Sequence, residues 1–254
     1  QYESILGTDI WKYNKAVKDK SVGQEAIESV LRQIIQVKVI GKEAAIEKVQ
    51  LATDEKEEAD YRAKTVFDSI PAKDKQTQGI ELKVLSKIFE ENKLAQKMYN
   101  VQMGKLKIDY AANTLSAAKV ELIYQAANAK NKETVKNTMS RILSEVTSSQ
   151  NSFYTVAKNK TQADAIEYVI GNQDSRTNLA KAVVSLKKNQ TSALIEEKDG
   201  FYIAHCIQTN SAALQQQYRN QLVSEKQTES FQKTYKIWSD KFDVKVSKAL
   251  LAAN

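Results

Sequence analysis

Glycine and proline are scarce in this sequence, and their scarcity constrains the fold more than any other feature. The 254 residues include 7 glycines and 1 proline. An all-β sandwich needs many turns with special backbone angles, and a glycine-rich nucleotide-binding fold needs loops that only glycine accommodates. The composition therefore argues against both classes and favours long helices. A chain of this length can form one large domain or two modest ones.

Four segments carry the apolar periodicity of amphipathic helices. The expected helices are residues 21–49, 53–70, 79–103 and 212–241. We expect the Thr53 hydroxyl to cap the second helix. Pro71 should end that helix near Ile70, because proline disfavours helical geometry in the residue before it. After the fourth helix, the alternation of residues 242–246 predicts a short strand.

The pattern changes between residues 115 and 210, where short apolar runs predict strands and helices in alternation. The expected strands are residues 119–124, 168–171, 192–197 and 201–207, and the expected helices are 134–146, 152–157 and 179–186. Asp199-Gly200 is the dipeptide of a tight hairpin between the last two strands. The order β-α-α-β-α-β-β predicts a compact α+β domain.

The whole chain is therefore predicted to be α+β, with three segments. A helical segment occupies residues 1–115, an inserted domain occupies 116–210, and residues 211–254 return to the helical domain. The long last helix cannot bury its apolar stripe alone, so we expect the N-terminal helices to pack against it.

The formal net charge is +7, and lysine supplies most of the positive charge. Because acids interrupt the lysines in most segments, we expect a solvated basic surface and no nucleic-acid partner. Cys206 is the only cysteine, so no intramolecular disulfide can form. No run of about 18 apolar residues occurs, so no transmembrane helix is expected. Gln1 is not an initiator methionine, which suggests export or trimming of the chain.

Three stretches of the middle segment resemble the parvulin family of peptidyl-prolyl isomerases. Residues 153–157 resemble the family's aromatic segment after its first helix, residues 179–192 its short helix and following turn, and residues 195–203 its closing hairpin. The helical segments before and after this domain are similar to those of SurA/PrsA-type foldases. The resemblance implies a long-helix chaperone domain, built from both ends of the chain, with a parvulin-like domain inserted.

The resemblance also implies where a catalytic site would lie. The family's strand histidines fall at Glu121 and Tyr202, its pocket methionine near Arg176, and its pocket phenylalanine at Val184. Its cysteine or aspartate falls near Gln162 or Ala163. Every one of these positions departs from the family's pattern, so no catalytic residue is assigned. The residues expected to contact a peptide are Glu121, Tyr202, Val184 and Cys206. No cofactor or metal is expected.

Strand parity separates two residues that could be mistaken for parts of that site. His205 lies an odd number of residues after Tyr202 and should face the other side of its strand, as a structural or surface histidine. Cys206 shares the parity of Tyr202 and could face the cavity or be a small buried residue. Glu121 and Tyr202 could hydrogen-bond a peptide or form a cross-strand pair.

Three hypotheses for function follow. The favoured one is an extracytoplasmic foldase or chaperone that binds unfolded or exported polypeptides, with a weak or inactive parvulin-like domain. The alternative is an active peptidyl-prolyl isomerase that assists secreted proteins. A third is an envelope protein that pairs with itself as a homodimer. We expect a bacterial cell-envelope location, secreted or held by a lipid anchor before Gln1.

Overall fold

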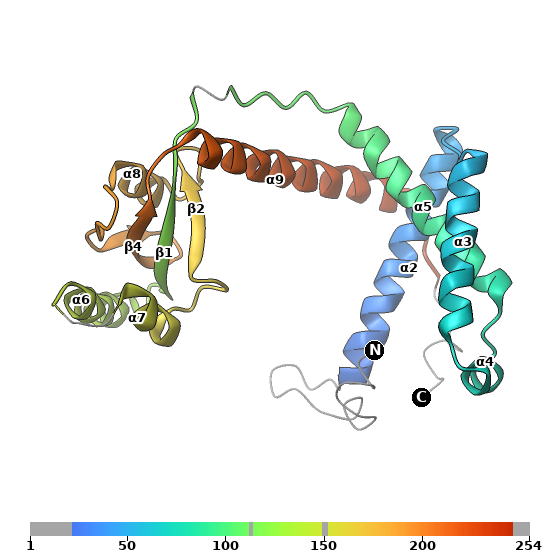
Figure 1. Ribbon diagram of the computed structural model, residues 1–254, viewed down its shortest axis with the longest axis horizontal. Coiled ribbons are helices and arrows are strands. Elements are labelled where there is room, and N and C mark those ends of the chain that lie inside the picture. Colours follow the sequence, from blue (N-terminus) through green and yellow to red (C-terminus); the bar gives the residue numbers. More distant parts are fainter. Residues whose placement is uncertain (1–21, 112–113, 149–151, 246–254) are drawn as a thin grey trace. The chain divides into compact units, whose positions relative to one another are not determined.

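The computed structural model describes residues 22–111, 114–148 and 152–245 (Figure 1). Long helices dominate residues 22–104. The chain divides into two compact units. A helical unit combines residues 1–107 with residues 227–254, and a mixed unit covers Ile108–Lys226. This α+β organisation confirms the predicted fold class. None of the helices within the described residues is long and apolar enough to span a membrane.

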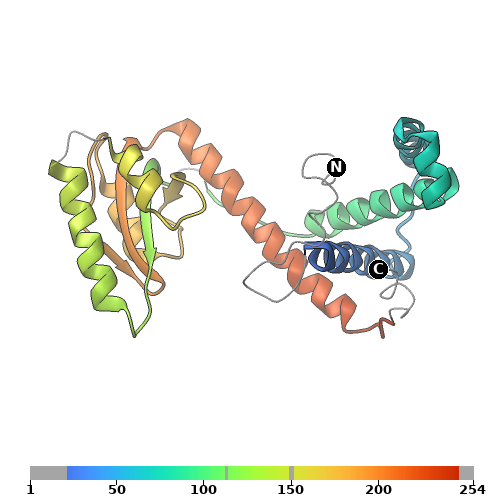
Figure 2. The same ribbon diagram turned by 90° about the horizontal axis from the view of Figure 1, so that it is seen from below.

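The helical unit is built from α2 (Val22–Ile46), α3 (Thr53–Ser69), α4 (Ala72–Gln78), α5 (Leu82–Gly104) and the second part of α9 (Ala212–Ser239). Helix α5 packs against both α2 and α3 (Figures 1 and 2). One buried cluster draws on three of these helices: Val39, Ile40 and Ala44 from α2, Met98 from α5 and Trp238 from α9. The last helix therefore packs with N-terminal helices, as its length required.

The helix ends show where local chemistry departs from the prediction. Thr53 is already inside α3, and the carboxylate of Glu55 accepts a hydrogen bond from the Ala52 N–H at 2.8 Å. The Glu55 carboxylate, three residues after the cap position, thus accepts a backbone N–H at the start of α3. We had expected the Thr53 hydroxyl to cap this helix. Pro71 ends α3 at Ser69, as expected. The short helix α4 was not predicted, and it ends at Gly79 with a left-handed φ of 60°.

The strand predicted for residues 242–246 is not found. Residues 242–245 form no strand, and Val246 lies outside the described residues. A strand is stable only beside a neighbour that accepts its backbone hydrogen bonds. Phe242 instead packs against the helical core around Trp238.

The mixed unit contains a four-stranded antiparallel sheet in the order β2-β1-β4-β3. The strands are β1 (Ala117–Ala126), β2 (Glu167–Gly171), β3 (Ile195–Glu197) and β4 (Gly200–Gln208). The helices are α6 (Lys132–Ser148), α7 (Phe153–Lys160) and α8 (Thr177–Ser185). The order β-α-α-β-α-β-β is as predicted. At the hairpin, Gly200 has φ 155° and lies so close to the Gln125 carbonyl that a Cβ would come within 2.2 Å of its oxygen.

Each face of the sheet carries its own buried cluster. Helix α8 covers one face, where Leu179 and Val183 meet alternate residues of β1 and β4. Helices α6 and α7 cover the other face, where Met139 and Phe153 meet the intervening residues (Figure 1). Because strand side chains alternate, the cluster to which a residue belongs fixes the face on which it can act.

The first part of α9 belongs to the mixed unit, which extends beyond the segment 116–210. Leu214, Tyr218 and Leu222 form a third buried cluster with Ala117 and Val169. The Tyr218 hydroxyl accepts a hydrogen bond from the Gln173 N–H at 3.1 Å. Gly171, at the end of β2, leaves room for the Tyr218 ring, since a Cβ there would come within 2.3 Å of it.

Candidate peptide-binding site

A hollow of about 190 Å³ opens on the side of the sheet that α8 covers, where the resemblance places a catalytic site. Strand β1 contributes two of its lining residues, and β2 and β4 contribute one each. The loop after α7 and the residue before α8 close the rest. The lining residues are Leu122, Tyr124, Gln162, Ala163, Asp164, Tyr168, Arg176 and Tyr202.

Two tyrosines from neighbouring strands form one wall of the hollow. Tyr124 and Tyr202 lie opposite each other in the β1–β4 ladder, and their rings stack with centroids 4.6 Å apart. The Tyr202 hydroxyl donates to the Asp199 carboxylate at 2.5 Å, and the Tyr124 hydroxyl donates to the Asp199 carbonyl at 3.0 Å. Both hydroxyl hydrogens are therefore already used by the hairpin turn.

The electrostatics keep the Tyr202 hydroxyl protonated. Burial raises the pKa of Tyr202 well above its usual range, and the hydrogen bond to Asp199 raises it further, while nearby Arg176 lowers it. Tyr202 is only 3% exposed, so it offers little surface to a bound peptide. The pKa of Tyr124 is raised as well, mainly by burial and also by Asp199.

Arg176 holds a fixed position at the mouth of the hollow. Its Nε and Nη2 donate to the two carboxylate oxygens of Asp174, at 2.9 and 2.7 Å. Its guanidinium carbon lies 5.6 Å from the centre of the Tyr202 ring, a cation–π arrangement. The hydrogen bond to Asp174 raises the pKa of Arg176, although burial opposes this. The arginine thus packs against the Tyr202 ring, and both side chains line the hollow.

Glu121 does not belong to this hollow. In the sheet it lies opposite His205 on β4 and Glu167 on β2, on the face away from Tyr202. Burial raises the pKa of Glu121, and the neighbouring Glu167 carboxylate adds to the effect. The expectation that Glu121 and Tyr202 share one groove is therefore wrong. The β1 residues that face the hollow are Leu122 and Tyr124.

The other expected contacts also lie elsewhere. Val184 lines a separate hollow of about 260 Å³ beside α8. Cys206 is fully buried beneath the sheet face that carries Tyr202, and burial raises the pKa of its thiol. Of the four residues expected to contact a peptide, the structure therefore places only Tyr202 at the hollow.

His205 lies on the opposite face, as strand parity predicted. Its ring stacks on Phe153 with centroids 5.3 Å apart, and its Nδ1 is 2.9 Å from the Thr191 hydroxyl. Burial lowers the pKa of His205. These contacts are those of a structural histidine.

The loop residues of the hollow fall only partly where the sequence placed them. Gln162 lies there as expected and joins the loop to β1, because its side-chain oxygen accepts the Ala126 N–H at 2.8 Å. Asp164 and Tyr168 also line the hollow and were not identified from the sequence. Asp164 was missed because residues 162–166 carry no periodicity that would indicate which way its side chain points.

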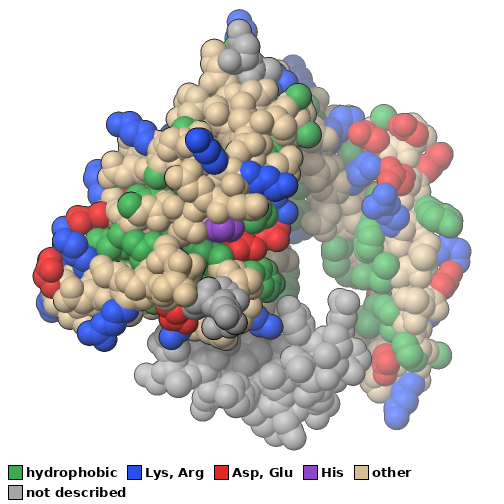
Figure 3. Space-filling model, turned by 60° about the vertical axis from the view of Figure 1, so that its left-hand side comes forward, with side chains coloured by type: hydrophobic (Ala, Val, Ile, Leu, Met, Phe, Trp, Pro, Cys, Tyr) green, Lys and Arg blue, Asp and Glu red, His purple; other side chains and the backbone are tan. Residues whose placement is uncertain are grey.

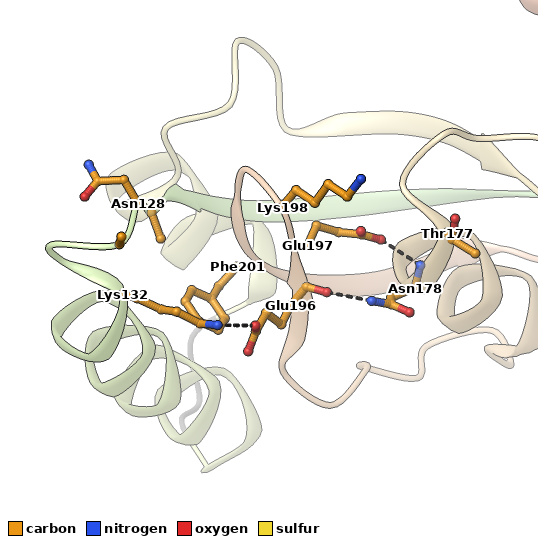
Figure 4. Close-up of a pocket in the computed structure, with 10 residues that line it drawn as sticks. Asn128, Lys132, Thr177, Asn178, Glu196, Glu197, Lys198 and Phe201 are labelled. Atoms are coloured by element: carbon orange, nitrogen blue, oxygen red, sulfur yellow. Dashed lines mark hydrogen bonds and ion pairs between the residues drawn. The ribbon is translucent and has the colours of Figure 1, made fainter.

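A larger hollow of about 630 Å³ lies beside β3 (Figure 4). Four of its polar side chains, those of Lys132, Asn178, Glu196 and Glu197, bind groups of neighbouring elements. The Glu197 carboxylate accepts the N–H groups of Asn178 and Leu179 at the start of α8, at 2.7 and 2.9 Å. Lys132 pairs with Glu196 at 2.6 Å. Glu197 thus caps α8 against β3, and this hollow is best explained as a structural junction.

No group of histidine, cysteine and acidic side chains that could hold a metal ion occurs within residues 22–111, 114–148 and 152–245.

Residues 115–208 match the family model described as "Rotamase: PPIC-type PPIASE domain". The match confirms the parvulin-like resemblance and covers most of the mixed unit. The comparison with curated proteins found no match.

Solved structures similar to this chain include two bacterial proteins that match over most of its length. Peptidylprolyl isomerase PrsA from Bacillus anthracis is 15% identical, with 86% of this chain and 99% of that chain covered and a TM-score of 0.46. A SurA-like chaperone from Campylobacter jejuni is 13% identical, with coverages of 93% and 92% and a TM-score of 0.32. An isolated PpiC-type isomerase domain is 20% identical, covers 40% of this chain and 98% of its own, and has a TM-score of 0.34.

Proposed function

We propose that this protein is an extracytoplasmic foldase that holds unfolded or exported polypeptides, and that its PpiC-type domain has little or no isomerase activity. The observation that carries the second part is that the side chains around the hollow beside Tyr202 already bind one another and the hairpin turn. Arg176 packs over the ring, and both tyrosine hydroxyls donate to Asp199.

Prolyl isomerisation breaks no covalent bond, and its barrier of about 18–20 kcal/mol comes from amide resonance. An enzyme lowers that barrier by holding the twisted amide in a dry apolar cup with polar groups aimed at it. Here the residues of β1 and β4 that face the hollow are Leu122, Tyr124 and Tyr202, at the strands where the family resemblance implies histidines. Leu122 has no polar group to offer, and both tyrosines have already used their donors.

Exposed apolar side chains support the first part of the proposal. Several large aliphatic residues of α2 and α5 lie 40–54% exposed, and hydrophobic side chains are visible among charged ones on the surface of the helical unit (Figure 3). These residues are Ile27, Val30, Ile34, Val84 and Ile88. Contiguous exposed apolar surface marks interaction sites for other polypeptides.

Two assays on the full chain test the proposal together. The first follows the refolding of a model protein limited by a proline bond, which takes tens to hundreds of seconds uncatalysed. We expect no acceleration. Acceleration that is lost in Tyr202→Phe but kept in Tyr154→Phe, on the exposed surface of α7, would instead establish the alternative of an active isomerase, which the family match favours.

The second assay follows light scattering by a denatured client protein as it is diluted from denaturant. We expect the wild-type chain to suppress aggregation. The double variant Val84→Asp with Ile88→Asp should suppress it less, while Val66→Asp on α3 should behave as wild type. No suppression by the wild-type chain would contradict the holding function.

The proposal extends to location and attachment. A bacterial cell-envelope location, with attachment through a lipid anchor outside this sequence, would place the protein where exported chains emerge. Fractionation of the cells that make it tests this, because a protein found only in the cytosolic fraction would exclude such a location.

A further inference from the structure

An apolar groove in the helical unit lies between α2 and the segment that follows α9, and we call it the α2 groove. It has a volume of about 550 Å³, within the range of ligand-binding clefts. Its apolar walls are formed by Leu31, Ile34, Ile35 and Val39 of α2 and by Phe242 and Val244.

The groove continues along an exposed face of α2. Ile34 is 49% exposed and Val244 is 45% exposed, so the apolar walls are open to solvent. Ile27 and Val30 precede Ile34 by seven and four residues, and are also exposed. These spacings place the three side chains on one face of the helix. The apolar surface is therefore a strip rather than an isolated cavity.

Lysines dominate the charged residues at the mouth of the groove. Lys38, Lys42, Lys241 and Lys245 line it, and Asp243 is the one acid among the lining residues. Lys38 pairs with Glu91 and Lys241 with Glu43, at 2.5 and 2.6 Å.

The other two lysines have charge to offer a ligand. Lys42 makes no ion pair within the part of the chain that the structure describes. Lys245 meets Asp243 only at 3.4 Å, with both side chains more than 80% exposed, and such a surface pair is weak. The carbon stems of these lysines can extend along the apolar walls while their ammonium groups stay in water.

We propose that the α2 groove binds an apolar stretch of a client polypeptide that is flanked by acidic residues. The proposal rests on the holding function and narrows the class of client. Aliphatic side chains of the client fill the groove, and flanking carboxylates meet Lys42 and Lys245. The charges contribute selectivity more than affinity, because they lie at a solvated rim.

The test uses the full chain and two fluorescently labelled synthetic peptides. Both have the same core of leucine, valine and phenylalanine. One is flanked by aspartates and the other by lysines, and binding is followed by fluorescence anisotropy. We expect the aspartate-flanked peptide to bind about fivefold more tightly, and the difference to shrink as salt is added.

Two variants and one control locate the binding. Ile34→Asp should weaken binding of the aspartate-flanked peptide at least about tenfold. It replaces an aliphatic side chain that the bound peptide would cover with a charge that repels the aspartates of the peptide. The pair Lys42→Glu with Lys245→Glu should reverse the preference between the two peptides. Val66→Asp, at a 40% exposed aliphatic position on α3 outside the groove, should bind both peptides as wild type does. Circular dichroism confirms that each variant keeps its helices.

The outcomes separate this inference from the holding function. If the wild-type chain suppresses aggregation but Ile34→Asp leaves peptide binding unchanged, the holding function stands and the α2 groove is not its site. If neither peptide binds, the α2 groove is no site for such client segments. If Ile34→Asp abolishes a concentration-dependent dimer, a second copy of this chain covers the groove. Either result overturns the inference.

Discussion

Glu121 carries an electrostatic cost that its position in the sheet creates. It lies directly opposite Glu167 in the β1–β2 ladder, and burial together with that like charge raises its pKa. Because the pKa is raised in the folded chain, ionisation of Glu121 opposes folding. The cost appears as the pH rises through the ordinary glutamate range and is complete above the raised pKa.

We therefore expect Glu121→Gln to stabilise the mixed unit at about pH 7. The gain should be about 0.5 kcal/mol, the size of one cross-strand pair. It should vanish below about pH 3, where Glu121 is protonated in both states. Urea unfolding at the two pH values measures the effect, with Glu145→Gln on α6 as the matched control. An equal gain at both pH values would show that charge is not the cause.

The same residue shows why the site was only partly predictable. The alternation of residues 119–124 identifies a strand, but Leu122 and Ile123 are both apolar and are both buried. The sequence is therefore compatible with either Glu121 or Leu122 on the face that carries the hollow. The resemblance pointed to Glu121, whereas the structure places Leu122 there. Tyr202 was placed correctly because the Asp-Gly turn fixes the start of β4. The contacts of Arg176 with Asp174 and Tyr202 depend on the loop before α8, whose path no periodicity reveals.

Among the elements, the first part of α9 depends on a close approach to β2. A Cβ on Gly171 would come within 2.3 Å of the Tyr218 ring and 2.6 Å of the Ser116 carbonyl oxygen. Burial raises the pKa of Tyr218 to about 12, which fits a ring enclosed by neighbouring elements.

We expect Gly171→Ala to destabilise the mixed unit by about 2 kcal/mol, the usual cost of overpacking a tight contact. In a Tyr218→Ala background the additional cost should be smaller, because only the clash with Ser116 remains. Chemical unfolding of the four proteins in this cycle measures the coupling. Gly104→Ala is the control, since a Cβ there meets open space. Strict additivity would mean that the ring is not what Gly171 accommodates.

Most elements were predictable because their signals are local. Apolar stripes predicted the long helices, Pro71 predicted the end of α3, and the Asp-Gly dipeptide predicted the β3–β4 hairpin. Helix α4 was missed because its seven residues contain one apolar side chain and no stripe. The terminal strand was wrong because alternation alone cannot supply a pairing partner. Sheet order and the packing of the first part of α9 on the sheet depend on contacts distant in sequence, which periodicity does not encode.

At the scale of the whole molecule, each buried cluster lies within one unit. The two clusters on the sheet faces and the cluster around Tyr218 belong to residues 108–226, and the cluster around Trp238 belongs to the helical unit. A unit with its own core can fold independently.

We accordingly expect a fragment of residues 108–226 to fold without the remainder. Its far-ultraviolet circular dichroism should show both helix and sheet, and its urea unfolding should be a single cooperative transition. A shorter fragment of residues 116–210, which lacks Leu214, Tyr218 and Leu222, should be less stable. If the shorter fragment proves equally stable, the α9 contacts contribute nothing to this fold.

The burial of Cys206 makes the rate of thiol labelling a measure of how often the mixed unit opens. The only thiol in the sequence is fully buried in the sheet of the mixed unit, with its pKa raised by burial. A maleimide can reach it only while that unit is open, so the labelling rate reports how often opening occurs. We expect labelling to be slow in buffer, and to accelerate in Gly171→Ala. Rapid labelling of the wild-type chain would mean that the sheet opens far more readily than its packing implies.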